Sequence, residues 1–258
     1  MKIFVFSPDY THQSGGIEAM HYLMYLLQRC GHKVITNTAV YNPAFDLKPE
    51  FRLLPERTDD MIIAPEIINL EGFYNLAIPV LRWVLYFPGR HGGPAVFPEE
   101  ETVYHYRKVF KKEAKQASYY KRTKELFLPH LSKEDFKIKQ KTLRDKGGLY
   151  FVHKGKNLKA HPESAVEINR ENTVTREMYL NLLRRYKTLY CYDPDTYLLA
   201  ESFLSGMKVM VWDYKGNKWK RILFCREKFR NYARDAKNVQ KILKDFSRKN
   251  KMKTTGNL

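Results

Sequence analysis

The sequence lacks several features that would define a class of protein at once. No apolar run approaches the roughly 20 residues that a membrane-spanning helix needs. No CxxC pair, GxGxxG fingerprint, P-loop or GxSxG motif is present. No paired aspartates stand out at a strand edge, and no His/Glu cluster has metal-ligand spacing. We therefore expect no metal and no cofactor.

Cysteine is also scarce. The three cysteines, Cys30, Cys191 and Cys225, are an odd number without metal-ligand spacing, which is typical of reduced thiols in a cytoplasmic protein. The amino-terminal run from Met1 to Pro8 is too short for a signal-peptide core and predicts a first strand instead. These features together predict a cytoplasmic protein.

Acidic residues are outnumbered, with 28 Asp and Glu against 46 Lys and Arg, giving a formal net charge of +18. Basic bands lie at Lys108–Lys124, Lys133–Lys146 and Lys241–Lys253. A single band of this kind is usually a solvated helix face. Three bands in one chain favour a negatively charged neighbour, and we expect peripheral contact with the inner face of an anionic membrane.

The pattern of the chain alternates strands with helices, and 43% of the residues are hydrophobic. Residues 2–7 and 33–36 read as strands around a helix from Ile17 to Cys30, which Gly31 ends. A second alternation begins at Gly147, and a basic helix is expected over residues 226–246 before a frayed end. The pattern predicts an α/β protein with domains at 1–132 and 133–225, a linker within 129–146, and a helical tail at 226–258.

Three short segments could carry chemistry. Asp193 follows a strand and Glu201 lies two helical turns further on, where an acidic side chain can bond ribose hydroxyls. Gly15 and Gly16 follow Ser14 ahead of the first helix, whose amino terminus attracts anions. Lys154 and Lys156 flank a glycine after the strand at 149–152, which suits a diphosphate. Each segment has an ordinary alternative: surface carboxylates, a tight turn, and two lysines in a lysine-rich chain.

Taken together, these segments resemble the GT-B glycosyltransferases, in particular the large retaining group that uses nucleotide sugars. The resemblance covers residues 2–36 and 147–212 best, and residues 37–146 only in outline. Two departures stand out: Asp193 occupies a position that is more often Glu in the family, and Lys154 with Lys156 replaces an Arg-then-Lys pair.

The resemblance implies two Rossmann-like domains that face a cleft, with the last helix returning to the first domain. It implies transfer of a sugar, with retention, from a nucleotide-diphosphate donor to a glycan or lipid-linked acceptor, without a metal. Asp193 and Lys154 would be the catalytic residues. The donor would be bound by Gly15, Gly16, Lys154, Lys156, Ile168, Arg170, Thr196, Tyr197 and Glu201. The segment from Tyr86 to Gly93, with His91, is a further candidate at the substrate.

Two other classes of function stay open. A basic nucleic-acid-binding protein would explain the charge and the 14% aromatic content, because aromatic rings stack on bases. However, the aromatics fall in strand-like segments where core packing is usual, and no nucleic-acid-binding motif is present, so the main interpretation includes no nucleic acid. A nucleotide-dependent dehydrogenase is disfavoured by the missing glycine fingerprint.

Overall fold

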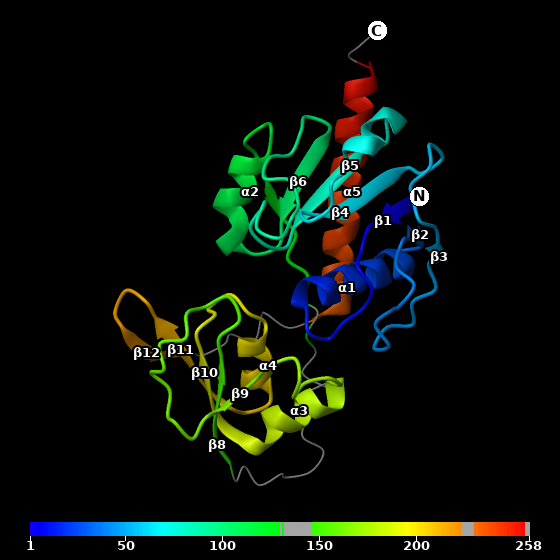
Figure 1. Ribbon diagram of the computed structural model, residues 1–258. Coiled ribbons are helices and arrows are strands. Elements are labelled where there is room, and N and C mark those ends of the chain that lie inside the picture. Colours follow the sequence, from blue (N-terminus) through cyan, green and yellow to red (C-terminus); the bar gives the residue numbers. More distant parts are fainter. Residues whose placement is uncertain (130, 132–145, 223–229, 256–258) are drawn as a thin grey trace. The chain divides into compact units, whose positions relative to one another are not determined.

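The chain is an α/β protein that divides into two compact units. The computed structural model describes residues 1–129, 131, 146–222 and 230–255 (Figure 1). The first unit comprises residues 1–130 together with 231–258, and the second comprises residues 131–230. The expected boundaries at 132/133 and 225/226, most of the expected linker, and Cys225 lie outside the described residues.

The first unit contains a seven-stranded sheet in which every pairing is parallel. Its strands, in spatial order, are β3 (Glu50–Phe51), β2 (Lys33–Thr36), β1 (Lys2–Val5), β4 (Met61–Pro65), β5 (Val80–Val84), β6 (Glu101–His105) and β7 (Lys124–Glu125). The central strands β1 and β4 are apolar runs buried on both sides, as parallel strands covered on two faces must be. The order is compatible with a doubly wound fold whose direction reverses between β1 and β4.

The first long helix, α1 (Gly15–Arg29), follows β1. Ser14 caps it, since the Ser14 hydroxyl accepts a hydrogen bond from the N–H of Ile17. Gly31 ends it with a φ of 81°, a left-handed conformation that glycine adopts without strain. The expected start at Ile17 was two residues late, because both glycines belong to the first helical turn.

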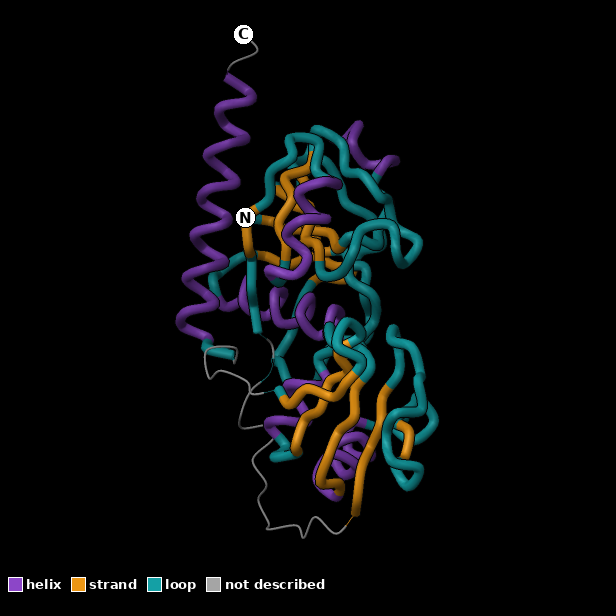
Figure 2. Tube along the Cα trace, turned by 90° about the vertical axis from the view of Figure 1, so that its left-hand side faces the viewer, coloured by secondary structure: helices purple, strands orange, loops and turns teal. Residues whose placement is uncertain are grey.

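The C-terminal helix α5 (Tyr232–Thr255) packs on α1 in the first unit (Figure 2). The buried Tyr22 hydroxyl on α1 donates to Asp235 Oδ2 at 2.9 Å. Val239, Leu243 and Phe246 form the buried stripe of α5. The helix continues to Thr255, so the expectation of a frayed end was wrong for residues 247–255, while residues 256–258 lie outside the described part of the chain. Shorter helices complete the unit: η1 (Glu71–Leu76), η2 (Lys108–Phe110) and α2 (Lys111–Ala117).

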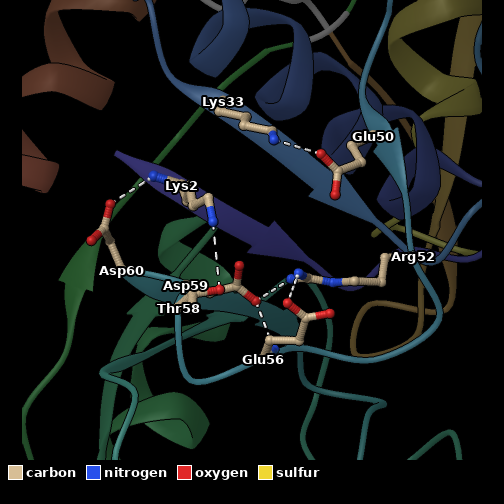
Figure 3. A network of polar contacts seen from close by, with 8 residues as sticks. All are labelled: Lys2, Lys33, Glu50, Arg52, Glu56, Thr58, Asp59 and Asp60. Atoms are coloured by element: carbon tan, nitrogen blue, oxygen red, sulfur yellow. Dashed lines mark hydrogen bonds and ion pairs between the residues drawn. The ribbon is translucent and has the colours of Figure 1, made fainter.

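Charged side chains link β1, β2 and β3 to the segment that precedes β4 (Figure 3). Lys33 pairs with Glu50 at 2.6 Å, and Arg52 binds both Glu56, at 2.8 Å, and the buried Asp59. The backbone N–H of Lys2 donates to the carboxylate of Asp60. Arg52 follows β3, whereas Glu56, Asp59 and Asp60 precede β4, so the network ties these strand ends together.

The second unit contains a five-stranded sheet with β12 (Lys218–Arg221), β11 (Lys208–Asp213), β10 (Tyr186–Cys191), β8 (Lys146–Phe151) and β9 (Val166–Glu167) in spatial order. Four strands are parallel and β12 is antiparallel to β11. Helices α3 (Arg176–Arg185) and α4 (Leu198–Leu204) join the strands. Both contribute buried side chains to one core with Leu149, Leu189 and Val209.

Candidate functional site at the carboxyl edge of the second sheet

In the second unit, the direction in which successive strands are added to the sheet reverses between β8 and β10. From β8 the chain continues to β9 on one side, and from β10 it continues to β11 on the other. The loops that leave the carboxyl ends of β8 and β10 therefore diverge, and a space between diverging loops is where open α/β sheets bind ligands. These loops begin at Val152 and Tyr192, and they contain the lysine pair and Asp193.

The loop after β8 is held close to the end of β10. A Cβ atom added to Gly155 would lie 2.3 Å from the carbonyl oxygen of Tyr192, so only glycine fits at this position. The N–H of Lys156 donates to the Tyr214 hydroxyl at 2.8 Å, and that hydroxyl donates to the Tyr192 carbonyl at 2.9 Å. The backbone of His153 has a φ of 39°, a left-handed conformation that is uncommon outside glycine. Packing and hydrogen bonds thus give the loop a defined path.

Two predicted site segments meet at this edge. Asp193 is only 4% exposed, and its Oδ1 accepts a hydrogen bond from the N–H of Asp195 at 3.0 Å. Its Oδ2 lies 4.0 Å from Nδ1 of His153. Lys154 and Lys156, on the same loop as His153, have exposed side chains. The edge therefore combines a buried carboxylate, an imidazole and two ammonium groups. The sequence analysis gave His153 no role.

Thr196 and Tyr197 precede α4, and both take part in the start of that helix. The Thr196 hydroxyl accepts a hydrogen bond from the N–H of Leu198 at 3.3 Å. The Tyr197 carbonyl accepts from the N–H groups of Ala200 and Glu201, and its half-buried ring packs against the core. The Thr196 hydroxyl thus occupies the N–H of Leu198 at the start of a helix where we expected the donor to bind.

Glu201 has a structural environment that its sequence position did not indicate. It is 5% exposed, and its carboxylate accepts hydrogen bonds from Arg176 Nη1, at 2.8 Å, and from the Tyr179 hydroxyl. Both donors come from α3, so the contacts join α3 to α4. Each carboxylate oxygen already accepts from α3 and the residue is 5% exposed, so these contacts do not favour the expected ribose contact.

Ile168 and Arg170, predicted at the nucleobase, have different environments. Ile168 is 5% exposed, belongs to the core of the second unit, and donates its N–H to the carbonyl of Tyr150 at 2.8 Å. Arg170 is exposed in the turn that follows. Only Arg170 therefore presents its side chain to solvent.

In the first unit, Gly15 and Gly16 lie at the start of α1, beside the reversal between β1 and β4. Neither has a positive φ, and a Cβ atom on Gly16 would meet Leu85 at 3.8 Å and the Ser14 hydroxyl at 3.9 Å, both ordinary contact distances. The backbone therefore does not require glycine at position 16. The amide groups of a first helical turn have no partners within the helix, which leaves the anion-binding role of this turn a prediction.

The same edge of the first sheet holds buried polar groups that the sequence analysis did not single out. His21 is fully buried: its Nδ1 accepts from the N–H of Asn42 at 3.2 Å, and its Nε2 lies 3.3 Å from the carbonyl of Pro8. Burial lowers the pKa of His21 below its ordinary value. These contacts indicate a neutral imidazole that donates from Nε2. Asp9 beside them is exposed; its carboxylate accepts from Thr38 and from two backbone N–H groups, which lower the pKa of that carboxyl.

Glu66 directly follows β4 and is 4% exposed. Its Oε2 accepts the N–H of Leu85 at 2.8 Å, and burial raises the pKa of the carboxyl. A Cβ atom on Gly93 would lie 2.2 Å from the Glu66 carbonyl oxygen, so the segment from Tyr86 to Gly93 returns to the end of β4. His91 in this segment stacks on Tyr86, with ring centroids 5.0 Å apart. A local sequence pattern cannot reveal these contacts, because their partners come from different strands.

Within the described part of the chain, no three His, Cys, Asp or Glu side chains gather in a way that could hold a metal ion. None of the described helices combines the length and the apolar character that crossing a membrane requires. No protein-family model matches the chain, and a search of curated proteins finds no relative.

Proposed function

We propose that the protein is a nucleotide-sugar-dependent glycosyltransferase of the GT-B type, with the donor bound by the second unit. We call residues 152–156, which contain Lys154 and Lys156, the lysine loop. The observation that carries the proposal is that this loop meets the buried Asp193 at the reversal point of the second sheet. The likeness of residues 2–36 and 147–212 to GT-B enzymes adds the type of reaction. In this proposal the first unit supplies the acceptor side.

The lysine loop would bind the diphosphate of the donor. Lys154 and Lys156 follow β8 on an exposed loop, and their ammonium groups would offset the charge that develops as the diphosphate leaves the anomeric carbon. Electrostatic stabilisation of a leaving group is the main contribution available without a metal. Removal of one such donor typically lowers the rate by about 10²–10³-fold.

Asp193 would act at the transferred sugar. Its carboxylate is largely shielded from water, and a negative charge acts more strongly on a developing positive charge in such surroundings. His153, 4.0 Å from this carboxylate, would orient it or donate to the leaving oxygen. The acceptor hydroxyl then forms the new bond to the anomeric carbon, the bond to the diphosphate oxygen breaks, and the hydroxyl proton passes to the departing diphosphate.

The contacts of Glu201 change one part of the expected binding mode. Because Arg176 and Tyr179 hold its carboxylate, we assign Glu201 to the junction of α3 and α4 and not to the ribose. Arg170 is exposed and keeps its predicted place near the nucleobase.

The test is a thermal-shift panel with UDP, GDP, CDP and NAD, followed by hydrolysis assays with the sugar donors of any nucleotide that binds. A ligand present at 100 times its dissociation constant stabilises the folded protein by about 2.7 kcal/mol. The double variant K154A/K156A should lose the shift, whereas K187A should keep it. Lys187 is an exposed lysine at the opposite end of β10, so it controls for the loss of charge. Equal binding by both variants, or a shift with NAD alone, would refute the proposal.

A further inference from the structure

One face of the second sheet carries aromatic side chains, and none of the described helices packs on it. Side chains alternate between the faces of a strand. Leu149, Leu189 and Val209 point to the core that contains α3 and α4. The residues that follow each of them, Tyr150, Tyr190 and Met210, therefore lie on the opposite face. A parallel sheet normally has both faces covered, so a helix-free face is unusual.

The register places these residues in one row across the sheet. Tyr190 on β10 is paired with Tyr150 on β8 and with Met210 on β11, and Met210 is paired with Arg221 on β12. Trp219 lies on the same face as Arg221, and its ring centroid is 5.2 Å from that of Tyr190. We call Tyr150, Tyr190, Met210, Trp219 and Arg221 the aromatic face. Arg221 is exposed and the other four are half-buried.

The aromatic face already holds one planar ring in a parallel stack. The imidazole of His161 lies on Tyr150 with centroids 3.8 Å apart and planes inclined by 11°. The Tyr190 ring is supported from below, since a Cβ atom on Gly148 would lie 2.8 Å from its Cε2. The face therefore presents flat rings in fixed positions, and a second planar group can stack beside His161.

The charges around this face favour an anionic ligand. By strand alternation, Lys208 shares the face with Arg221, and both side chains are exposed. The one carboxylate in the same row is Glu167, which accepts a hydrogen bond from the Tyr150 hydroxyl at 3.2 Å. Cations beside partly exposed rings are what single-stranded nucleic acids bind, through phosphates and stacked bases. A neutral glycan would gain from the rings but not from the charges.

We propose that the aromatic face binds single-stranded nucleic acid, with a base stacked on Tyr190 and phosphates near Lys208 and Arg221. This proposal is independent of the sugar-transfer site, which lies at the carboxyl edge of the sheet. It also accounts for aromatics that the sequence analysis assigned to core packing.

The test uses fluorescence anisotropy with labelled oligo-dT and oligo-U of 12 nucleotides on the full chain. Y190L should weaken binding about ten-fold, whereas Y190F, which keeps the ring, should bind as the unchanged protein does. R221A should lower the dependence of log K on log salt by about 0.7. Y119L removes an exposed ring from the first unit and should have no effect. Thermal unfolding shows whether Y190L is folded, and R221A tests the face even if Y190L is not.

Two results would overturn the proposal. Equal affinities of Y190L, Y119L and the unchanged protein would show that binding depends on net charge alone. Stronger binding of double-stranded DNA, or of a neutral glucan, than of the single strands would show that the face serves another ligand.

Discussion

Gly155 gives the sharpest test of the lysine loop, because its close approach to Tyr192 can be perturbed by one methyl group. A Cβ atom at this position would meet the Tyr192 carbonyl oxygen at 2.3 Å and its carbon at 2.6 Å. Real Cβ contacts are not shorter than 3.0 Å, so the loop would have to retreat by roughly 0.7 Å. The neighbouring atoms are backbone and cannot rotate away. We therefore expect G155A to displace Lys154 and Lys156 together.

A displacement approaching 1 Å in a site can lower a catalytic rate about 100-fold. G155A should therefore reduce donor hydrolysis by up to about 100-fold and weaken the nucleotide-dependent thermal shift. The matched control is G147A on β8, where an added Cβ atom meets nothing within 4 Å. Donor hydrolysis would be measured for both variants alongside the unchanged protein. Full activity of a folded G155A would show that the path of the loop does not matter to the reaction, and the assignment of the lysines would fail.

Three further predictions concern the buried polar groups. R82M should lower the free energy of unfolding of the first unit by roughly 3–5 kcal/mol in urea titrations. It leaves the fully buried carboxylate of Glu101 without its cation, although the Tyr74 hydroxyl still donates to it, and a loss below about 1 kcal/mol would contradict this prediction. The pKa of His21 is lowered in the folded state, so unfolding takes up a proton and the free energy of unfolding should fall as the pH drops below about 6.5. H21Q should flatten this pH dependence, and an unchanged slope would assign it to other groups. E201Q should reduce the free energy of unfolding by roughly 1.5–3 kcal/mol, because it weakens the hydrogen bonds to α3, and it should leave nucleotide affinity unchanged. Unchanged thermal unfolding together with weaker binding in a nucleotide titration would restore the ribose contact.

The sequence predicted the elements whose signals lie within a short stretch of the chain. The β1–α1–β2 unit was predicted because apolar periodicity, a serine cap and a terminal glycine agree along the chain. The strand β12 was missed, since Lys-Trp-Lys-Arg places charges on both sides of an exposed edge and hides the alternation. The helix α5 extends further than predicted, because no glycine or proline interrupts residues 232–255.

The site was predictable only where its residues follow the strand ends directly. Lys154, Lys156 and Asp193 each come within a few residues of a parallel strand, and parallel strands bring their carboxyl ends to one edge. The partners of Glu201 lie on another helix, 22 and 25 residues earlier in the chain. Pairing over such distances depends on tertiary packing, which the spacing of an acidic motif does not encode.

The first unit is assembled from two separate segments, residues 1–130 and 231–258, with the whole second unit inserted between them. During synthesis, α1 emerges early, but Asp235, which accepts from the Tyr22 hydroxyl, follows 213 residues later. Until then the apolar surface of α1 that meets α5 has no cover, while the inserted segment can fold as one continuous stretch. A nascent chain cut before α5 should therefore aggregate or recruit chaperones, and the last helix decides when the first unit is complete.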